Sequence, residues 1–315
     1  MKKRKVAIIG VGHVGAHCAY SLILQGIVDE LVLVDKDAQK AKSERQDLLD
    51  AVAYCPHRVE VSIADYDELG DCDIIVVSVG KVALLETHDR LTELNLTVRE
   101  VTEFMPKVMS GGFHGIIINI TNPCDIITRQ IAKISKLPKG HVFGTGTGLD
   151  TSRLLSALSQ ATGIDTKSIT AYMLGEHGAA IMAPLSQISF RGKSLESLRE
   201  NPKFRFQAEQ LKKLVHDAAW ITFDGKKCTE YGICSTLARD VDIVLRDEKV
   251  IMPVSAPLEG EYGQTDIFLG VPAILGAGGA EEIIELDLTE KEREEFARCS
   301  DGVRHNMTLN DLIIQ

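Results

Sequence analysis

The stretch K-V-A-I-I-G-V-G-H-V-G at residues 5–15 decides the fold class of this 315-residue chain. An apolar run ends at Gly10, and Gly12 and Gly15 complete the spacing G-x-G-x-x-G. In a strand–loop–helix unit the first glycine permits a tight turn, the second admits a pyrophosphate to the backbone, and the third lets the helix lie on the sheet. We expect that helix over residues 17–25. The stretch therefore predicts a dinucleotide site.

A carboxylate at the end of the next apolar run supports this interpretation. Asp35 follows E-L-V-L-V (30–34) and lies 20 residues beyond Gly15. At that place a carboxylate accepts hydrogen bonds from both ribose hydroxyls of a dinucleotide, whereas a 2′-phosphate would meet like charge. The sequence thus favours NAD over NADP. The alternative is a glycine-rich turn that binds no ligand.

Short apolar runs recur through the first half of the chain. They are continuous rather than alternating, which is typical of parallel strands buried on both faces. Between the third and fourth runs, apolar residues from Leu94 to Val108 recur at helical spacing. Strand and helix in alternation predict an α/β fold, a doubly wound parallel sheet of the Rossmann type, over residues 1–145. The runs are 5–9, 30–34, 73–79, 115–120 and 141–145.

The second half has a different pattern of apolar residues, from which we expect a mixed α+β domain over residues 146–315. Three helical stripes are followed by strand candidates that contain Gly and Pro, and Thr289 precedes Glu292 at the spacing of a capping box. No repeat or linker separates the halves. The stripes begin at Leu154, Leu211 and Ile233, and the strand candidates are 250–256 and 265–276.

Composition excludes several classes of function. The chain is 44% hydrophobic and 25% charged with a net charge of −10, which is typical of a soluble globular protein and disfavours nucleic acid or an anionic membrane as partner. The N-terminal apolar run stops at Ile9, so we expect neither a signal peptide nor a membrane span. The seven cysteines are scattered without metal-ligand spacing, which predicts free thiols, no metal and a cytoplasmic location.

Four separated segments contain residue types that suit the chemistry of an alcohol or carbonyl group. Polar side chains flank turns or the ends of predicted elements in each of them. They are His177 in L-G-E-H-G (174–178), Asp150 and Arg153 in L-D-T-S-R (149–153), Asn122 in N-I-T-N-P (119–123), and Arg90 in D-R (89–90). A lone histidine is more often structural, so the set matters more than any member.

Each step of hydride transfer finds a candidate in this set. A histidine with a pKa near neutrality can take a proton from a hydroxyl and return it to a carbonyl oxygen. Asp150 and Arg153 share a helix face at three-residue spacing. A carboxylate beside the imidazole fixes its tautomer, and a guanidinium pairs with a substrate carboxylate in two-point geometry.

The chain resembles the lactate/malate dehydrogenase family in G-V-G-H-V-G with Asp35, T-N-P, L-D-x-x-R and G-E-H-G, in that order. The resemblance implies that His177 is the acid/base with Asp150 as its partner, that Arg153 binds the substrate carboxylate, and that Arg90 polarises the carbonyl oxygen from a mobile loop. It also implies further positions around substrate and NAD. Asn122 and Thr229 line the substrate pocket, and Gly10, Gly12, Val14, Gly15, Asp35, Gly80, Asn122 and Ile233 contact the cofactor.

The loop K-V-A-L-L-E-T-H-D-R (81–90) is expected to select the substrate side chain. In the family, malate dehydrogenases carry an Arg in this loop and lactate dehydrogenases typically a Gln, whereas this chain has Ala83, Leu84 and Leu85. An apolar wall favours pyruvate or a larger aliphatic 2-oxo acid, because an unpaired second carboxylate is costly to bury. The loop and K-K-C-T-E-Y-G (226–232) most resemble the L-2-hydroxyisocaproate dehydrogenase branch. Lys81 or His88 could still pair with a diacid, and Lys227, Cys228 and Glu230 depart from the branch pattern.

The resemblance also bears on partners. We expect a homodimer or a homotetramer with a small 2-oxo or 2-hydroxy acid as substrate. Leu155 and Thr170 occupy the positions where activated bacterial relatives have cationic phosphate ligands, so we expect no activation by fructose bisphosphate. Three alternatives stay open at this point. They are malate dehydrogenase activity, an NAD-dependent glycosidase, and a non-catalytic NAD-binding sensor.

Overall fold

The predicted parallel sheet is present in the structure, a computed structural model that describes residues 3–80, 90–178 and 180–314. Six strands of the first half are parallel and lie in the order β3-β2-β1-β4-β5-β6. The chain reverses its direction of travel across the sheet between β1 and β4, which creates a crevice at their carboxyl ends. The strands are β1 (Lys5–Ile9), β2 (Glu30–Val34), β3 (Glu60–Ile63), β4 (Ile74–Val77), β5 (Ile116–Asn119) and β6 (Val142–Gly144).

One strand was not predicted, one helix begins earlier than predicted, and β4, β5 and β6 are shorter than the predicted runs. The apolar runs do not predict β3, because this edge strand buries only Val61 and so lacks a continuous apolar run. Helix α1 begins at His13, inside the glycine-rich loop, rather than at His17. The helices of this half are α1 (His13–Leu24), α2 (Ala38–Val52), α4 (Arg90–Ser110) and α5 (Cys124–Ser135).

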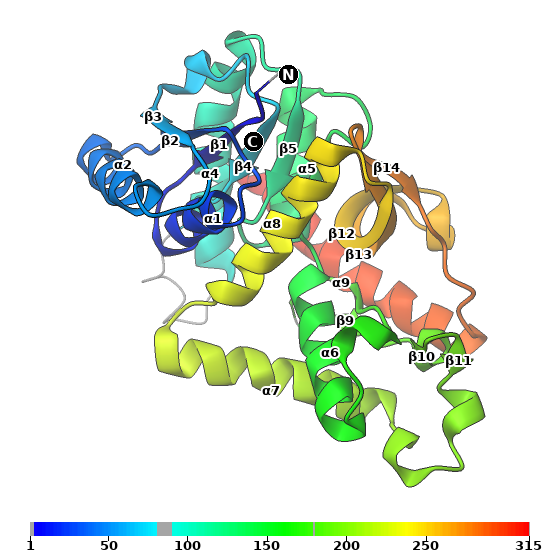
Figure 1. The fold of residues 1–315 in the computed structure, drawn as a ribbon. Helices are drawn as coiled ribbons and strands as arrows, with labels where there is room; N and C mark the ends of the chain where they lie inside the picture. Colours follow the sequence, from blue (N-terminus) through cyan, green and yellow to red (C-terminus); the bar gives the residue numbers. More distant parts are fainter. Residues whose placement is uncertain (1–2, 81–89, 179, 315) are drawn as a thin grey trace.

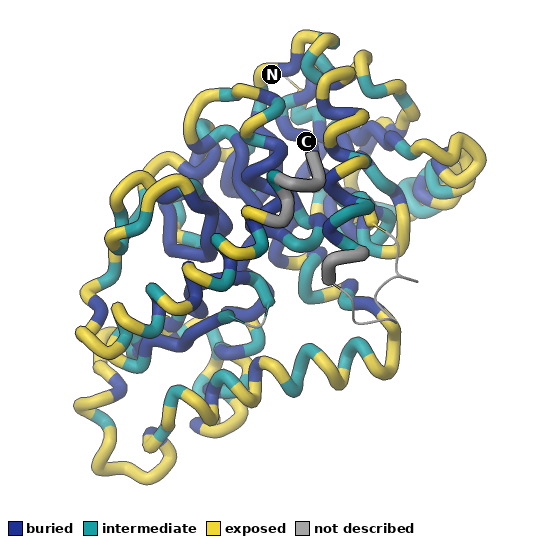
Figure 2. The backbone as a smooth tube through the Cα atoms, turned by 180° about the vertical axis from the view of Figure 1, so that it is seen from behind, coloured by how far each residue is buried: buried dark blue, intermediate teal, exposed yellow. Residues whose placement is uncertain are grey.

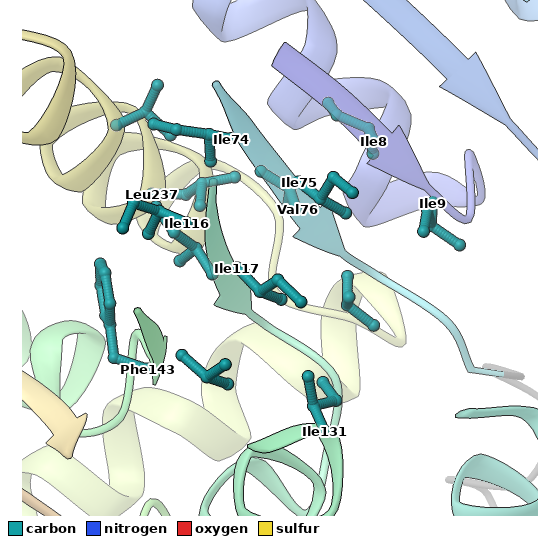
Figure 3. Packing of buried hydrophobic residues seen from close by; sticks show 14 of the residues in the cluster. Ile8, Ile9, Ile74, Ile75, Val76, Ile116, Ile117, Ile131, Phe143 and Leu237 are labelled. Atoms are coloured by element: carbon teal, nitrogen blue, oxygen red, sulfur yellow. The ribbon is translucent and has the colours of Figure 1, made fainter. Parts of the chain in front are cut away.

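The core lies along the central strands. The whole of β4 is fully buried, as are Val6 to Ile9 of β1, which explains why these segments read as continuous apolar runs. Figure 3 shows β-branched side chains of β1, β4 and β5 packed together, with Leu237 of the second half beside them. The two halves of the chain therefore share one hydrophobic core.

The second half extends the same sheet. Ser255 of β12 pairs antiparallel with Gly144 of β6, and the order continues β12-β13-β8-β9, with β14 on β13. A separate sheet has the order β11-β10-β7. The strands are β7 (Ile169–Thr170), β8 (Leu174–Gly175), β9 (Ile181–Met182), β10 (Ser189–Phe190), β11 (Lys193–Ser194), β12 (Val250–Glu259), β13 (Thr265–Gly276) and β14 (Gly279–Ile283).

In the part of this half that the structure describes, the α-helices are α6 (Gly148–Thr162), α7 (Ala208–Lys226), α8 (Tyr231–Arg246) and α9 (Glu290–Ile314). The three predicted stripes are confirmed, because they lie on α6, α7 and α8. The capping box is also confirmed, since Thr289 N donates to Glu292 Oε2 at 2.9 Å and Glu292 N donates to Thr289 Oγ1 at 3.3 Å. Helix α8 runs back across the molecule against α1, whereas α7 lies at one end and is mostly exposed (Figures 1 and 2). Among the described helices, none combines the length and the apolar character needed to cross a membrane.

Candidate active site

The three glycines of the loop after β1 have different surroundings. Gly10 has φ +90°, and a Cβ there would lie 2.4 Å from Ser78 O, while a Cβ on Gly15 would lie 2.0 Å from Gly10 O. Both glycines are therefore required for the loop and α1 to pack on the sheet. Around a Cβ on Gly12, by contrast, no atom of the described chain lies within 4 Å. Gly12 thus borders open space, where a ligand can approach the backbone.

This open space is suited to a dinucleotide. Gly12 is also the N-cap of α1 and has no side chain to accept from the first N–H groups of the helix, which leaves them for an anion. The carboxylate of Asp35, directly after β2, accepts from Val11 N and Asp37 N at 2.9 Å each. Gly80, after β4, borders similar space within the described part of the chain. Gly12, Asp35 and Gly80 thus lie in the segments that follow β1, β2 and β4, at the carboxyl ends of parallel strands, where a dinucleotide is expected to bind.

A buried asparagine shapes the segment that carries Asn122. Asn119, fully buried at the end of β5, accepts from Thr121 N at 3.0 Å and donates to Thr128 Oγ1 at 3.0 Å. Thr121 Oγ1 in turn accepts from Val79 N at 2.8 Å, which ties the end of β4 to the end of β5. Asn122 is half-buried and its peptide bond to Pro123 is cis. The segment is therefore held beside Gly80 at the carboxyl edge of the sheet.

The structure brings together His177, Asp150 and Arg153, as predicted. His177 lies in the turn after β8, and its Nδ1 is 2.6 Å from Asp150 Oδ2. Arg153, one turn later on α6, donates from Nη1 to Asp150 Oδ1 at 3.0 Å. Asp150 is only 4% exposed, so its carboxylate is held between the imidazole and the guanidinium. Among the described residues, the bond of the imidazole is made by Nδ1 and that of the guanidinium by Nη1.

The charges of this group control its protonation. Burial alone would raise the pKa of Asp150, but His177 and Arg153 together hold that pKa below its ordinary value. Burial likewise acts to lower the pKa of His177, yet the negative charge of Asp150 and the bond to it raise that pKa above its ordinary value. Asp150 is therefore ionised and accepts a hydrogen bond from Nδ1–H of His177. The other ring nitrogen, Nε2, is then the one that can exchange a proton.

Sequence reasoning missed a second buried carboxyl group, that of Asp125. Its Oδ2 accepts from the backbone N–H of His177 at 3.0 Å, and its Oδ1 accepts from Ser255 Oγ at 2.5 Å. Burial raises the pKa of Asp125 to about 7, with the charge of Glu176 acting in the same direction. Its position three residues after Asn122 is the only signal in the sequence, and that signal says nothing of burial.

The junction of α7 and α8 lies against the cofactor helix. Thr229 is half-buried at this junction, and Ile233 packs on the core from the first turn of α8. Glu230 forms an ion pair with Lys226, and its Oε1 lies 3.7 Å from His17 Nδ1 of α1. The carboxylate of Glu230, a departure from the family branch, is thus paired within the protein. Cys234 Sγ, next to Ile233, lies 3.8 Å from the carbonyl oxygen of Val14.

Several predicted residues lie outside the described part of the chain. Residues 81–89, with Lys81, Ala83, Leu84, Leu85 and His88, are among them. Arg90 is the first residue of α4, and its assigned role stays a prediction.

Metal ligation finds no support in the described residues, among which no group of three or more His, Cys, Asp or Glu side chains could hold an ion. All seven cysteines are free, and six of them are buried. Burial raises the pKa of the Cys124 thiol, beside the Asn122 segment, to about 12. A buried thiol with a raised pKa, as at Cys124, is a poor nucleophile.

Comparison with known proteins agrees with this geometry. Residues 4–144 match the model of the lactate/malate dehydrogenase NAD binding domain, and residues 147–310 match that of the alpha/beta C-terminal domain of the same family. An L-lactate dehydrogenase of Fusobacterium nucleatum is 43% identical, with 94% of this chain and 93% of the relative covered. L-lactate dehydrogenase 2 of Listeria monocytogenes is 40% identical, with 98% and 99% covered.

Solved structures show the same likeness. The minor L-lactate dehydrogenase of Enterococcus mundtii in its ligand-bound form superposes with a TM-score of 0.91 at 35% identity, covering 98% of both chains. A lactate dehydrogenase from a deep-sea metagenome library superposes with a TM-score of 0.92 at 32% identity, covering 99% of this chain and all of the other. With its glycine loop after β1 and its half-buried His177 bonded to the buried Asp150, this chain belongs to the lactate/malate dehydrogenase family, oxidoreductases that act on CH–OH groups with NAD.

Proposed function

We propose that the protein is an L-2-hydroxyacid dehydrogenase of the L-lactate dehydrogenase type, which reduces 2-oxo acids with apolar side chains at the expense of NADH. The observation that carries the proposal is the contact of His177 and Arg153 with one buried carboxylate, that of Asp150. This arrangement supports the assignment of a proton donor and an anion-binding cation to one site. The relatives named above as L-lactate dehydrogenases support the same reaction.

His177 is assigned the proton transfer. In the direction of reduction, Nε2 of the imidazolium gives its proton to the carbonyl oxygen, and in oxidation the neutral ring takes a proton from the hydroxyl. Asp150 holds the ring by accepting from Nδ1 and stabilises the imidazolium. The bound cofactor supplies or accepts the hydride. Because reduction needs the imidazolium, its rate is expected to fall as the pH rises through the pKa of His177.

Three further residues are assigned to the substrate. The guanidinium of Arg153 is held by one bond to Asp150 and offers its remaining donors to the substrate carboxylate. Asn122, at the end of β5, is assigned a hydrogen bond to the substrate beside the nicotinamide. Arg90 is assigned the polarisation of the carbonyl oxygen. These donors stabilise the negative charge that develops on that oxygen during reduction.

The preference for apolar side chains rests on Ala83, Leu84 and Leu85 in the substrate loop. Glu230 is consistent with it in one respect, because its carboxylate pairs with Lys226 and neutralises the charge of that lysine. A panel of pyruvate, 2-oxobutyrate, 2-oxoisocaproate, phenylpyruvate and oxaloacetate, assayed by oxidation of NADH, tests the proposal. We expect the aliphatic monoacids to be preferred. A higher kcat/KM with oxaloacetate would make the protein a malate dehydrogenase instead.

Other expectations stay predictions. They include the domain division at residue 145, a homodimer or homotetramer and a cytoplasmic location. The absence of fructose bisphosphate activation is one more, and Leu155 supports it by packing on the core of the second half. Saturating fructose bisphosphate is expected to leave the KM for pyruvate unchanged. A severalfold decrease in that KM would contradict this expectation.

A further inference from the structure

The carboxyl group of Asp125 joins three segments of the chain that carry or support the site. Asp125 lies in the first turn of α5, three residues after Asn122, and is 2% exposed. One of its oxygens accepts from the backbone N–H of His177 at 3.0 Å, and the other accepts from Ser255 Oγ of β12 at 2.5 Å. Since Ser255 is fully buried, the carboxyl group has a fixed partner on each side.

This contact holds His177 by its backbone. The strand β8 ends at Gly175, which has φ +101°, so His177 itself lies in a turn outside any ladder. Its side chain is held by Asp150 from α6, and its backbone N–H is held by Asp125 from α5. The position of the imidazole relative to the Asn122 segment therefore depends on the Asp125 carboxyl group.

The same group also contributes charge near the imidazole. Asp150 and Arg153 face His177 from α6, and Asp125 faces it from α5. The negative charge of Asp125 raises the pKa of His177 in addition to the effect of Asp150, whereas Arg153 lowers it. Glu176, in the same turn as His177, raises the pKa of Asp125. Two carboxyl groups thus bond to His177, that of Asp150 to its ring and that of Asp125 to its backbone, and the proposed mechanism uses only the first.

We propose that Asp125 is a positioning residue for His177, whose carboxyl group fixes the turn carrying the imidazole against the Asn122 segment and adds a second buried acid to the group formed by Asp150 and His177. This inference rests on the proposed function. It assigns Asp125 no contact with substrate or cofactor.

The substitution Asp125→Asn tests the charge of Asp125 apart from its hydrogen bond. The amide oxygen can still accept from His177 N, while the negative charge is lost. The readout is the pH dependence of kcat/KM for pyruvate reduction and for L-lactate oxidation. In the variant both pH limbs are expected to move together to lower pH, by about half to one pH unit. A purely structural role would lower both maxima and leave the limbs in place, and that result would overturn the inference.

Asp240→Asn is the matched control. Asp240, on α8, is also a fully buried carboxyl group, and the part of the chain that the structure describes offers its oxygens no hydrogen-bond partner. Its substitution is expected to leave both pH limbs unmoved. Movement of the limbs by the same amount in both variants would show a general effect of replacing a buried carboxyl group, which also contradicts the inference.

A titration without cofactor or substrate separates this inference from the proposed function. The imidazole of His177 is followed by NMR in protein with labelled histidine, and its signal is identified by its loss in His177→Asn. We expect its midpoint at lower pH in Asp125→Asn and, by a smaller amount, in Ser255→Ala, where Asp125 loses its hydroxyl donor. Ser255→Ala also decides the matter if Asp125→Asn does not fold. Unchanged midpoints overturn the inference, whereas a wild-type protein inactive on every 2-oxo acid overturns only the proposed function.

Discussion

The two parts of the site lie at the same edge of one sheet but are built from different chemistry. The cofactor part consists of glycine and backbone, with open space at Gly12 and the uncapped start of α1. The acid/base part consists of ionisable side chains, namely the buried Asp150 and the half-buried His177 and Arg153 that bond to it. The first part recognises phosphate by shape and by peptide dipoles, which do not titrate. The second works only in defined protonation states. An added methyl group should therefore weaken cofactor binding in the first part, and the loss of a charge should impair proton transfer in the second.

The largest expected effect comes from His177→Asn, which removes the proton donor and leaves the cofactor part intact. We expect kcat for pyruvate reduction to fall by roughly 10²- to 10⁴-fold, the usual contribution of acid–base catalysis. The Kd for NADH, measured by fluorescence titration, should stay within about twofold of wild type because glycine and backbone bind the cofactor. A folded variant with near wild-type kcat would contradict the role of His177.

Arg153→Lys should have the next largest effect. Lysine keeps the charge but loses the planar pair of donors, one of which is committed to Asp150. We expect kcat/KM for pyruvate to decrease by about 10- to 100-fold, in line with roughly 1.5–3 kcal/mol for a hydrogen bond to a charged group. Steady-state kinetics with NADH at saturation is the measurement. An unchanged KM for pyruvate would show that Arg153 only holds Asp150.

Alanine substitutions at two glycines of the loop after β1 distinguish a glycine needed for packing from a glycine needed for cofactor binding. Gly15→Ala forces a Cβ to within 2.0 Å of Gly10 O, and we expect a loss of about 1–3 kcal/mol in the free energy of unfolding. Gly12→Ala meets open space, so it should fold as wild type but bind NADH several-fold more weakly. Urea unfolding and NADH titration of both variants test this. Equal loss of stability in the two variants would contradict the assignment of Gly12 to the ligand.

The smallest expected effect on activity comes from Asp240→Asn. Burial raises the pKa of Asp240 well above its ordinary value. A raised folded-state pKa means that its contribution to stability is fully present below about pH 4 and is lost as the pH rises through the folded-state pKa. Asparagine does not titrate, so the variant should be more stable than wild type at pH 7.

The difference in stability between the two proteins should decrease toward pH 4. Urea unfolding of wild type and Asp240→Asn at pH 4, 5.5 and 7 measures it. A variant less stable than wild type at pH 7 would show that Asp240 has a partner when the protein is in solution.

Most of the fold could be predicted from the residues, because strands buried on both faces read as continuous apolar runs. The runs at 5–9 and 30–34 match β1 and β2 residue for residue. Strand β3 was not predicted because an edge strand needs few apolar residues. The first residue of α1 was not predicted correctly because Gly12, its N-cap, has no side chain that signals a cap.

The sequence by itself determined the glycine loop, the carboxylate after the second strand and the separate segments that hold His177, Asp150 and Arg153, since each is a local pattern of residue types. Only the tertiary structure decided that Asp150 lies between the imidazole and the guanidinium, and that Asp125 holds the backbone of His177. Asp125 and His177 are 52 residues apart in the chain. Their contact exists because α5 and β8 both pack on β13, and local residue patterns do not encode such packing.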